Sequence, residues 1–178
     1  QLVGQPGTPL IFLQNTTGFI GGTDPERRGI IKAGAKMIQA VANATVPRIT
    51  LMIGASFGAG NYAMSGWAYE PRFILGWPNY KTAVMGARQA ALVMRIVHEA
   101  RAERLGKPMD EEKLGALERQ VIDLYESMQD GVYASARLWD DGMIDPRDSR
   151  NVLGLLLSVC NEAERRTLNP NTFGVARF

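Results

Sequence analysis

Apolar residues form two short runs in the N-terminal third of the chain, at residues 10–13 and 49–53. Both runs are rich in strand-forming residues and end at polar or glycine-containing segments, which predicts two buried strands. Between them, apolar residues recur at helical spacing after Asp24-Pro25-Glu26, a sequence typical of a helix start. One helix is therefore expected from residue 24 to about residue 44. The order of strand, helix and strand predicts a parallel βαβ unit.

Two further apolar pieces, at residues 73–75 and 82–85, predict additional strands. After Gly86 the spacing becomes helical, first in one stripe and then in a second amphipathic stripe between residues 114 and 128. A last helix is expected to begin at Asp145-Pro146. The C-terminal half is thus predicted to be mostly helical and to form a lid or an oligomer contact. The first stripe contains Ala90, Val93, Ile96, Val97 and Ala100, and the last helix is expected to turn inward Val152, Leu153, Leu156 and Cys160.

The composition excludes several classes of protein. The chain has 178 residues, a net charge of +2 and scattered basic residues, so neither nucleic acid nor an anionic membrane is an expected partner. Its only cysteine is Cys160 and its only histidine is His98, which rules out an internal disulfide and a conventional structural zinc site. The longest apolar run is shorter than the roughly 20 residues of a membrane span. No metal is expected, and the predicted location is the cytoplasm.

A turn of small residues, Gly54 to Gly60, follows the second strand and precedes an expected helix at about residues 60–67. The first amide groups of a helix have no partner within the helix and carry the positive end of its dipole. Small side chains at Ala59 and Gly60 would let a ligand oxygen approach these donors. The turn is therefore predicted to be a backbone oxyanion site. The alternative is a tight turn that only packs the helix on the sheet.

Three other motifs could explain the same turn. Gly54-Ala55-Ser56-Phe57-Gly58 matches a G-x-S-x-G nucleophile elbow, but only Glu70 lies between Ser56 and His98, and His98 belongs to a helical stripe. Ser56 is instead expected to satisfy backbone groups in the turn. A P-loop is excluded because Asn61 follows Gly60, and Glu70 comes too early for a dinucleotide-binding site.

The remaining polar residues have structural interpretations. His98 is expected to be a solvated or half-buried helix residue, and Cys160 a small core residue. The acidic residues 110–112 are expected to start a helix, and Asp140-Asp141 to form a turn with Gly142. No carboxylate pair stands out as an acid and base. The chain thus offers backbone donors for a developing oxyanion such as an enolate, and enolisation of a thioester is the natural candidate.

Several ordered motifs extend over nearly the whole chain. They occupy residues 13–19, 29–32, 57–64, 68–73, 77–79, 135–142 and 173–175. In these motifs the chain resembles the C-terminal half of the carboxyltransferase β subunit of biotin-dependent acyl-CoA carboxylases. The sequences of the motifs at residues 58–62 and 136–142 most resemble those of the methylcrotonyl-CoA and geranyl-CoA carboxylase branch.

The resemblance implies an α/β fold of the crotonase-like class, a ββα superhelix with a helical C-terminal part. It implies a single domain over residues 1–178, with a core at about 8–100, a helical region at about 100–178, and the N-terminal half missing. The family moves CO₂ from N1′ of carboxybiotin to an acyl-CoA carbon, and the biotin anion takes the substrate proton. Two oxyanion holes serve the two enolates. The one for the biotin ureido oxygen maps onto the amides of Ala59 and Gly60.

The resemblance also assigns binding residues and partners. Met85 and Gly86 would lie near the acyl pocket. The implied cofactor is biotin on a carrier domain, the substrate is a coenzyme A thioester, and the location in a eukaryote is the mitochondrial matrix. The implied partners are the N-terminal half, an α subunit with biotin carboxylase and carrier domains, and further copies in a hexameric ring. The biotin side would be lined by Thr17, Gly18, Phe19, Ile20 and Gly21.

Two alternatives remain at this point. One is another crotonase-type enzyme, an enoyl-CoA hydratase or isomerase, which needs an acid/base carboxylate near the turn. Glu70 is the only early candidate for that role. The other is a non-catalytic assembly domain of the same fold.

Overall fold

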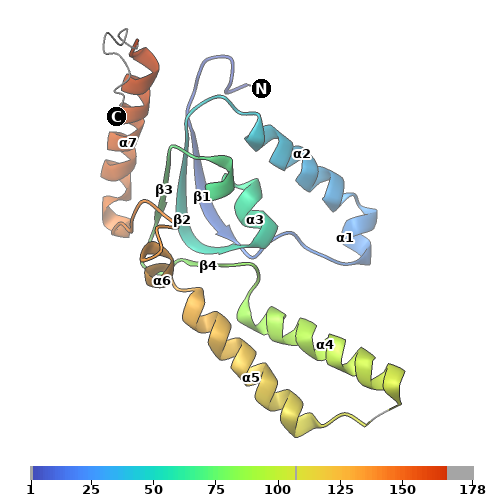
Figure 1. Cartoon of the computed structure of the whole chain (residues 1–178). Coiled ribbons are helices and arrows are strands. Elements are labelled where there is room, and N and C mark those ends of the chain that lie inside the picture. Colours follow the sequence, from blue (N-terminus) through green and yellow to red (C-terminus); the bar gives the residue numbers. More distant parts are fainter. Residues whose placement is uncertain (1, 107, 168–178) are drawn as a thin grey trace, which may run out of the picture.

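A computed structural model describes residues 2–106 and 108–167, and a four-stranded parallel sheet forms its centre (Figure 1). Strand β2, Arg48–Phe57, pairs with β1, Leu10–Thr16, along one edge. Along its other edge β2 pairs first with β3, Phe73–Gly76, and then with β4, Lys81–Ala83. The mixed α/β class and the parallel βαβ unit are confirmed.

The two predicted strands differ in burial. Ile49, Leu51 and Met52 of β2 are buried between two layers of helices, as expected. The prediction of a buried first strand is wrong in part, because β1 lies at the edge of the sheet and exposes Ile11 and Leu13.

The helix predicted from residue 24 to about 44 is two helices. Helix α1 covers Thr23–Arg27 and α2 covers Ile30–Ala42. Between them Gly29 has a φ of 89°, a left-handed conformation that interrupts the helical backbone. The turn that was expected to begin at Gly54 is also shorter. Strand β2 continues to Phe57, and the next helix, α3, is Gly58–Ala63 rather than residues 60–67.

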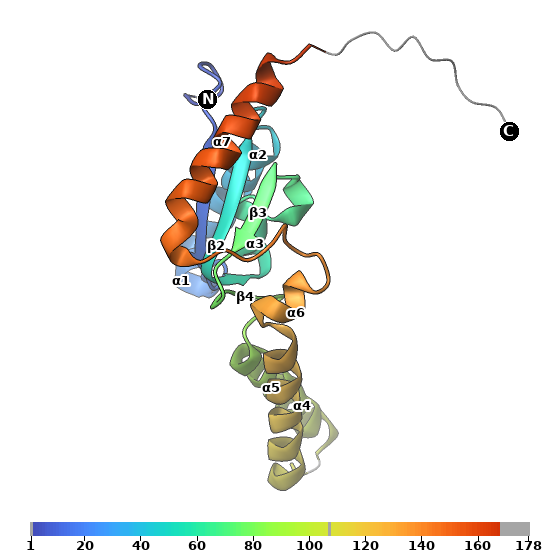
Figure 2. The ribbon, with the colours of Figure 1, turned by 90° about the vertical axis from the view of Figure 1, so that its left-hand side faces the viewer.

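The sheet has a helical layer on each face (Figures 1 and 2). Helices α2 and α3 cover one face, and α7, Ser149–Arg165, lies across the other. A 3₁₀ turn, Pro146–Asp148, precedes α7, and the indole Nε1 of Trp77 donates a hydrogen bond of 2.9 Å to Ser149 Oγ. Cys160 is buried, as predicted.

Two long helices project away from the sheet as an antiparallel pair (Figures 1 and 2). These are α4, Ala87–Leu105, and α5, Glu111–Met128, and the short α6, Gly131–Ser135, leads back to the sheet. The predicted helices are confirmed. However, only Ala90 of the first stripe is buried, whereas Val93, Ile96 and Val97 are 51%, 54% and 59% exposed.

The segment after α6 is fixed to the sheet through Tyr80. The ring of Tyr80 packs directly on Gly76 and Gly131. A Cβ added to Gly76 would lie 2.2 Å from a ring carbon, and one added to Gly131 would lie 2.8 Å from another. Its hydroxyl donates to the carboxylate of Asp140, and burial and this hydrogen bond raise the pKa of Tyr80.

The predicted turn at Asp140-Asp141 is present as a bend before Gly142, but the two carboxylates do more than stabilise it. Asp140 is 5% exposed and also accepts a hydrogen bond from Ser135 Oγ at 2.7 Å. Asp141 accepts one from the amide of Ile74 at 2.8 Å. Both carboxylates serve long-range contacts, because the chain after α6 returns to lie against β3 and the segment that follows it.

Candidate functional site

The junction between β2 and α3 places the first amide groups of a helix at the end of the central strand. Phe57 is extended, with φ −112° and ψ 140°, and Gly58 turns the chain with a φ of 54°. A Cβ on Gly58 would lie 2.7 Å from the carbonyl oxygen of Val84, so only glycine fits there. Phe57 makes no side-chain cap of α3. The amides of Ala59 and Gly60 belong to this uncapped first turn, where helical donors have no partner within the helix.

Ala59 and Gly60 have different surroundings. Gly60 is buried against the end of β1, and a Cβ on it would lie 2.9 Å from the side chain of Thr16 and 3.0 Å from Gly18 Cα. Ala59 is exposed. Of the two adjacent positions predicted as catalytic, only Ala59 can accept a larger side chain without disturbing β1.

Ala59 lies between two cavities. The first has a volume of about 400 Å³ and lies beside the loop after β1. Of the five predicted biotin-side residues, Phe19, Ile20 and Gly21 line it, together with α2, whereas Thr17 and Gly18 do not. Gly18 instead donates its amide to Thr16 Oγ1 at 3.2 Å, which shapes the start of the loop.

The second cavity, of about 490 Å³, lies beside α3 and β4. Its walls include the exposed aromatic side chains of Tyr62 and Trp139, and Val84. It stops short of Met85 and Gly86, the two residues predicted near the acyl pocket, which follow Val84 directly. Gly86 is the N-cap residue of α4.

Ser56 is not placed to act as a nucleophile. Its side chain is 0% exposed and its hydroxyl donates to Gln14 Oε1 at 2.5 Å. The hydroxyl also accepts from Asn61 Nδ2 at 2.8 Å. The expectation that Ser56 satisfies backbone groups in the turn is therefore wrong as well. Ser56 lies inside β2, and both of its partners are side chains.

Glu70 lies far from the amides of α3. The carbonyl of the preceding residue, Tyr69, accepts a hydrogen bond of 2.5 Å from the side chain of Arg48, the first residue of β2. The amides of α3 follow Phe57, the last residue of β2. The ten residues of β2 span about 30 Å. Glu70 is exposed at the opposite end of the strand, so it cannot serve as the acid or base of a hydratase at this junction.

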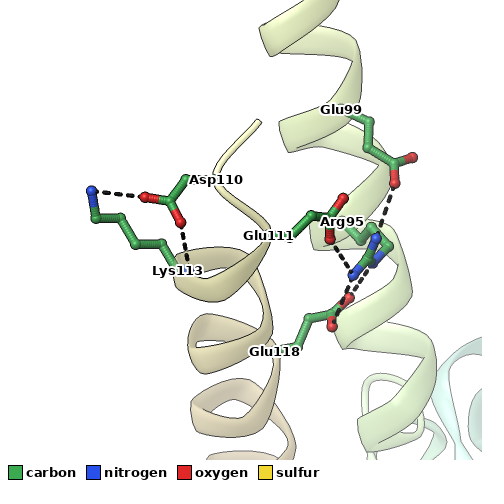
Figure 3. A network of polar contacts seen from close by, with 6 residues as sticks. All are labelled: Arg95, Glu99, Asp110, Glu111, Lys113 and Glu118. Atoms are coloured by element: carbon green, nitrogen blue, oxygen red, sulfur yellow. Dashed lines mark hydrogen bonds and ion pairs between the residues drawn. The ribbon is translucent and has the colours of Figure 1, made fainter. Parts of the chain in front are cut away.

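His98 and the acidic residues after α4 are structural. His98 is half-buried and lines a cavity of about 340 Å³ between α4 and α5, as expected for a helix residue. Asp110 caps α5 by accepting from the amide of Lys113 at 3.1 Å, and its contacts with Lys113 lower its pKa (Figure 3).

Burial raises the pKa of the Cys160 thiol. Within residues 2–106 and 108–167, no group of three or more histidine, cysteine or acidic side chains could hold a metal.

Sequence reasoning assigned no role to Gln14, Tyr62 or Trp139, although all three lie at or near the junction. Tyr62 and Trp139 occur within the motifs at residues 57–64 and 135–142, so the motifs could have drawn attention to them. Gln14 likewise lies in the motif at residues 13–19, but nothing in the local sequence indicated that its side chain would be buried beside α3.

The parallel sheet, its two helical layers and the uncapped helix start at the end of β2 define a mixed α/β domain whose candidate site is built from backbone donors. No helix among the described residues is long and apolar enough to cross a membrane. The sequence matches the carboxyl transferase domain over residues 1–175, and the chain belongs to this family. The match confirms the resemblance carried by the motifs, of which residues 173–175 lie outside the described part of the structure.

Known relatives indicate which branch of the family the chain is most similar to. The chain is 50% identical over 178 residues to the mitochondrial methylcrotonoyl-CoA carboxylase beta chain of Arabidopsis thaliana, covering 100% of this chain and 30% of that protein. It is 49% identical over 170 residues to the biotin-dependent 3-methylcrotonyl-coenzyme A carboxylase beta1 subunit of Mycobacterium tuberculosis, covering 96% and 32%. It is also similar to the crystal structure of the P. aeruginosa geranyl-CoA carboxylase beta subunit, with 55% identity, a TM-score of 0.89 and coverage of 99% and 33%.

A more distant structural relative is transcarboxylase 12S, whose crystal structure is described as a hexamer assembly. The identity is 30%, the TM-score 0.71, and the coverage 95% of this chain and 30% of that one. The chain thus spans about a third of the length of these relatives.

Proposed function

We propose that this chain is the biotin-side half of the carboxyltransferase of a biotin-dependent acyl-CoA carboxylase. The chain would contribute to moving CO₂ from carboxybiotin to an acyl-CoA. The observation that carries the proposal is the uncapped first turn of α3, which lies between two cavities at the end of the central strand. Membership of the carboxyl transferase family and the names of the relatives support it.

In this proposal the amides of Ala59 and Gly60 donate hydrogen bonds to the ureido oxygen of biotin. Bound carboxybiotin supplies the CO₂ that is transferred. Two fixed donors stabilise a developing oxyanion most strongly where water is excluded. The close packing of Gly60 against Thr16 and Gly18 supports such a role, because it holds one donor rigidly while exposed Ala59 leaves the approach open.

The residues present fit a biotin ring on one side of Ala59. The first cavity is apolar and about 400 Å³ in volume, which suits a small bicyclic ring. Phe19, Ile20 and Gly21 would contact the ring, and Thr17 and Gly18 would hold the loop in place. The ring of Phe19 packs on Gly34, where an added Cβ would lie 3.1 Å away, so α2 supports the loop from below.

The acyl group would approach from the other side of Ala59. The second cavity brings Tyr62, Val84 and Trp139 together there, and Met85 and Gly86 continue the same segment toward α4. A branched apolar acyl group suits this apolar wall. The methylcrotonyl-CoA and geranyl-CoA carboxylases among the relatives act on such groups by name. The finer fold assignment, a crotonase-like ββα superhelix in a single domain with its core at about residues 8–100, belongs to the same proposal.

Partners of this chain would cover its exposed apolar side chains. Ile11 and Leu13 of β1 and the stripe on α4 are open to solvent, and relatives have roughly twice as much additional chain. An N-terminal carboxyltransferase half, a biotin-carrying α subunit and further copies in a hexamer are the proposed partners. In a eukaryote the complex would be mitochondrial, as the names of two relatives state for those proteins.

The two alternatives find less support. A hydratase or isomerase needs a carboxylate at the junction, and Glu70 lies at the other end of β2. A non-catalytic assembly domain would have no need of an uncapped helix start flanked by two cavities.

The test is Ala59→Val in the full-length protein with its carrier subunit. Added methyl groups at this exposed position obstruct the approach to the amides, so carboxyl transfer is expected to fall about 100- to 1000-fold, as when one oxyanion donor is lost. Ala163→Val, at an exposed position on α7, is the control and should retain activity. Gly60→Val is less informative because it also collides with β1. Full transfer activity in Ala59→Val would refute the proposed site.

A further inference from the structure

Three polar side chains from three elements meet beside α3. They are Gln14 from β1, Ser56 from β2 and Asn61 from α3. Gln14 and Ser56 are both 0% exposed. The large majority of buried polar side chains in proteins form hydrogen bonds, and a network of such bonds has a defined geometry.

Gln14 is the centre of the network and uses both ends of its carboxamide. Its Nε2 donates to the carbonyl of Met64 at 2.7 Å and to that of Asn61 at 3.3 Å. Its Oε1 accepts from Ser56 Oγ at 2.5 Å and, more distantly, from Asn61 Nδ2 at 3.4 Å. The Ser56 hydroxyl closes the network by accepting from Asn61 Nδ2 at 2.8 Å. All the donors and acceptors of one side chain are therefore directed at α3 and the strand before it.

This arrangement determines where the first turn of α3 lies. The helix has only six residues and no side-chain cap, so its position depends on its contacts with the neighbouring strands. The side chain of Gln14 binds the carbonyl of Met64, just beyond the C-terminus of α3. The side chain of Asn61 links the middle of the helix to Ser56. Gly60 lies one residue before Asn61 and contacts Thr16, two residues after Gln14. A change at Gln14 would thus move the helix as a unit, together with its amides.

We propose that Gln14 is a positioning residue for carboxyl transfer. Through Ser56 and Asn61 it sets the distance between the amides of Ala59 and Gly60 and the oxygen that they stabilise. This inference rests on the proposed function and adds to it a set of side chains that never contact the reactants. A displacement of about 1 Å can cost on the order of 100-fold in rate.

The experiment uses the full-length protein with its carrier subunit. Gln14→Met keeps the length of the side chain and removes its hydrogen bonds, and it should lower kcat between about 10- and 100-fold with KM for the acyl-CoA unchanged. Ser56→Ala breaks one part of the same network and should lower kcat less. The double variant should lose no more than Gln14→Met alone, because both changes act through one network.

Ile74→Val is the matched control for lost stability. Ile74 is buried in β3 with Met52 and Tyr80, away from the network, so its substitution lowers Tm but should leave kcat unchanged. If Gln14→Met and Ser56→Ala lower Tm as Ile74→Val does yet keep full kcat, the inference fails while the proposed function stands. Ser56→Ala decides the question alone if Gln14→Met does not fold. A wild-type enzyme that transfers no carboxyl group to any acyl-CoA would overturn the proposed function and the inference together.

Discussion

At the scale of single residues, the junction depends on two neighbours with opposite constraints. Replacement of Gly58 is costly, because its φ of 54° disfavours an L side chain and an added Cβ would lie 2.7 Å from the Val84 carbonyl oxygen. Ala59 can change without affecting the fold, because it is exposed. Gly58 thus determines the shape of the turn, and Ala59 borders the proposed site. Substitutions at the two positions can test these roles separately.

Gly58→Ala tests the structural constraint. The left-handed backbone and the contact with Val84 together should cost about 2 kcal/mol in the free energy of unfolding. For a chain of 178 residues this corresponds to a fall in Tm of about 4–8 °C by calorimetry. Gly29→Ala is the control, since Gly29 also has a positive φ but nothing within 4 Å of an added Cβ. A loss at Gly29 equal to that at Gly58 would mean that contact with Val84 contributes nothing.

At the scale of elements, α4 and α5 are joined by charge as well as by apolar contact. Arg95 of α4 donates to Glu118 of α5 at 2.5 Å and lies 3.3 Å from Glu111 and 3.4 Å from Glu99 (Figure 3). The hydrogen bond from Arg95 lowers the pKa of Glu118, and the same bond raises the pKa of Arg95. The carboxylates therefore help to hold together a helical pair that projects from the sheet.

The stability of this pair should depend on pH. The pKa of Glu118 is lower in the folded protein, so between the folded and unfolded pKa values the unfolded chain binds more protons. The stabilisation is fully present above the ordinary pKa of glutamate, about 4.3, and is lost as the pH falls through the lower folded value. Melting temperatures measured from pH 7 to pH 3 should fall less steeply in Glu118→Gln than in wild type. Glu126→Gln, at an exposed position on α5, should keep the wild-type slope, and equal slopes in both variants would contradict the assignment.

At the scale of the whole molecule, the chain leaves apolar surface on α4 without a cover. Leu92, Val93, Ile96 and Val97 recur at helical spacing and are each more than half exposed. Contiguous apolar surface of this kind marks a contact with another protein or another part of the same one. We propose the apolar face of α4 as a contact with another copy or another part of the full-length protein.

Ile96→Asp tests this contact in the full-length protein. A charge in the middle of the apolar face should lower the molar mass of the assembly, measured by light scattering after size exclusion, without unfolding α4. Gln120→Asp, an exposed position on α5, introduces the same side chain outside this face and should leave the assembly intact. An unchanged molar mass in Ile96→Asp would exclude this face from the oligomer contact.

The sequence by itself determined the order of strands and helices, the family and the small residues at the junction. Each of these is recorded in local spacing or in short motifs. It also predicted the contribution of the loop after β1, of which Phe19, Ile20 and Gly21 line a cavity beside Ala59. The roles in biotin and acyl binding stay predictions.

Only the tertiary structure decided how far β2 extends, what Ser56 and Asp140 do, and that Gln14 belongs to the site. Strand β2 continues through Gly54 because its end pairs with β4, which follows more than 20 residues later. Ser56 and Gln14 are 42 residues apart, and Tyr80 and Asp140 are 60 apart. A local pattern records whether a residue is apolar, but the partner that satisfies a buried polar group is chosen by the packing of distant segments. For the turn at Gly58 the donors could therefore be inferred from the sequence, whereas the network that positions them could not.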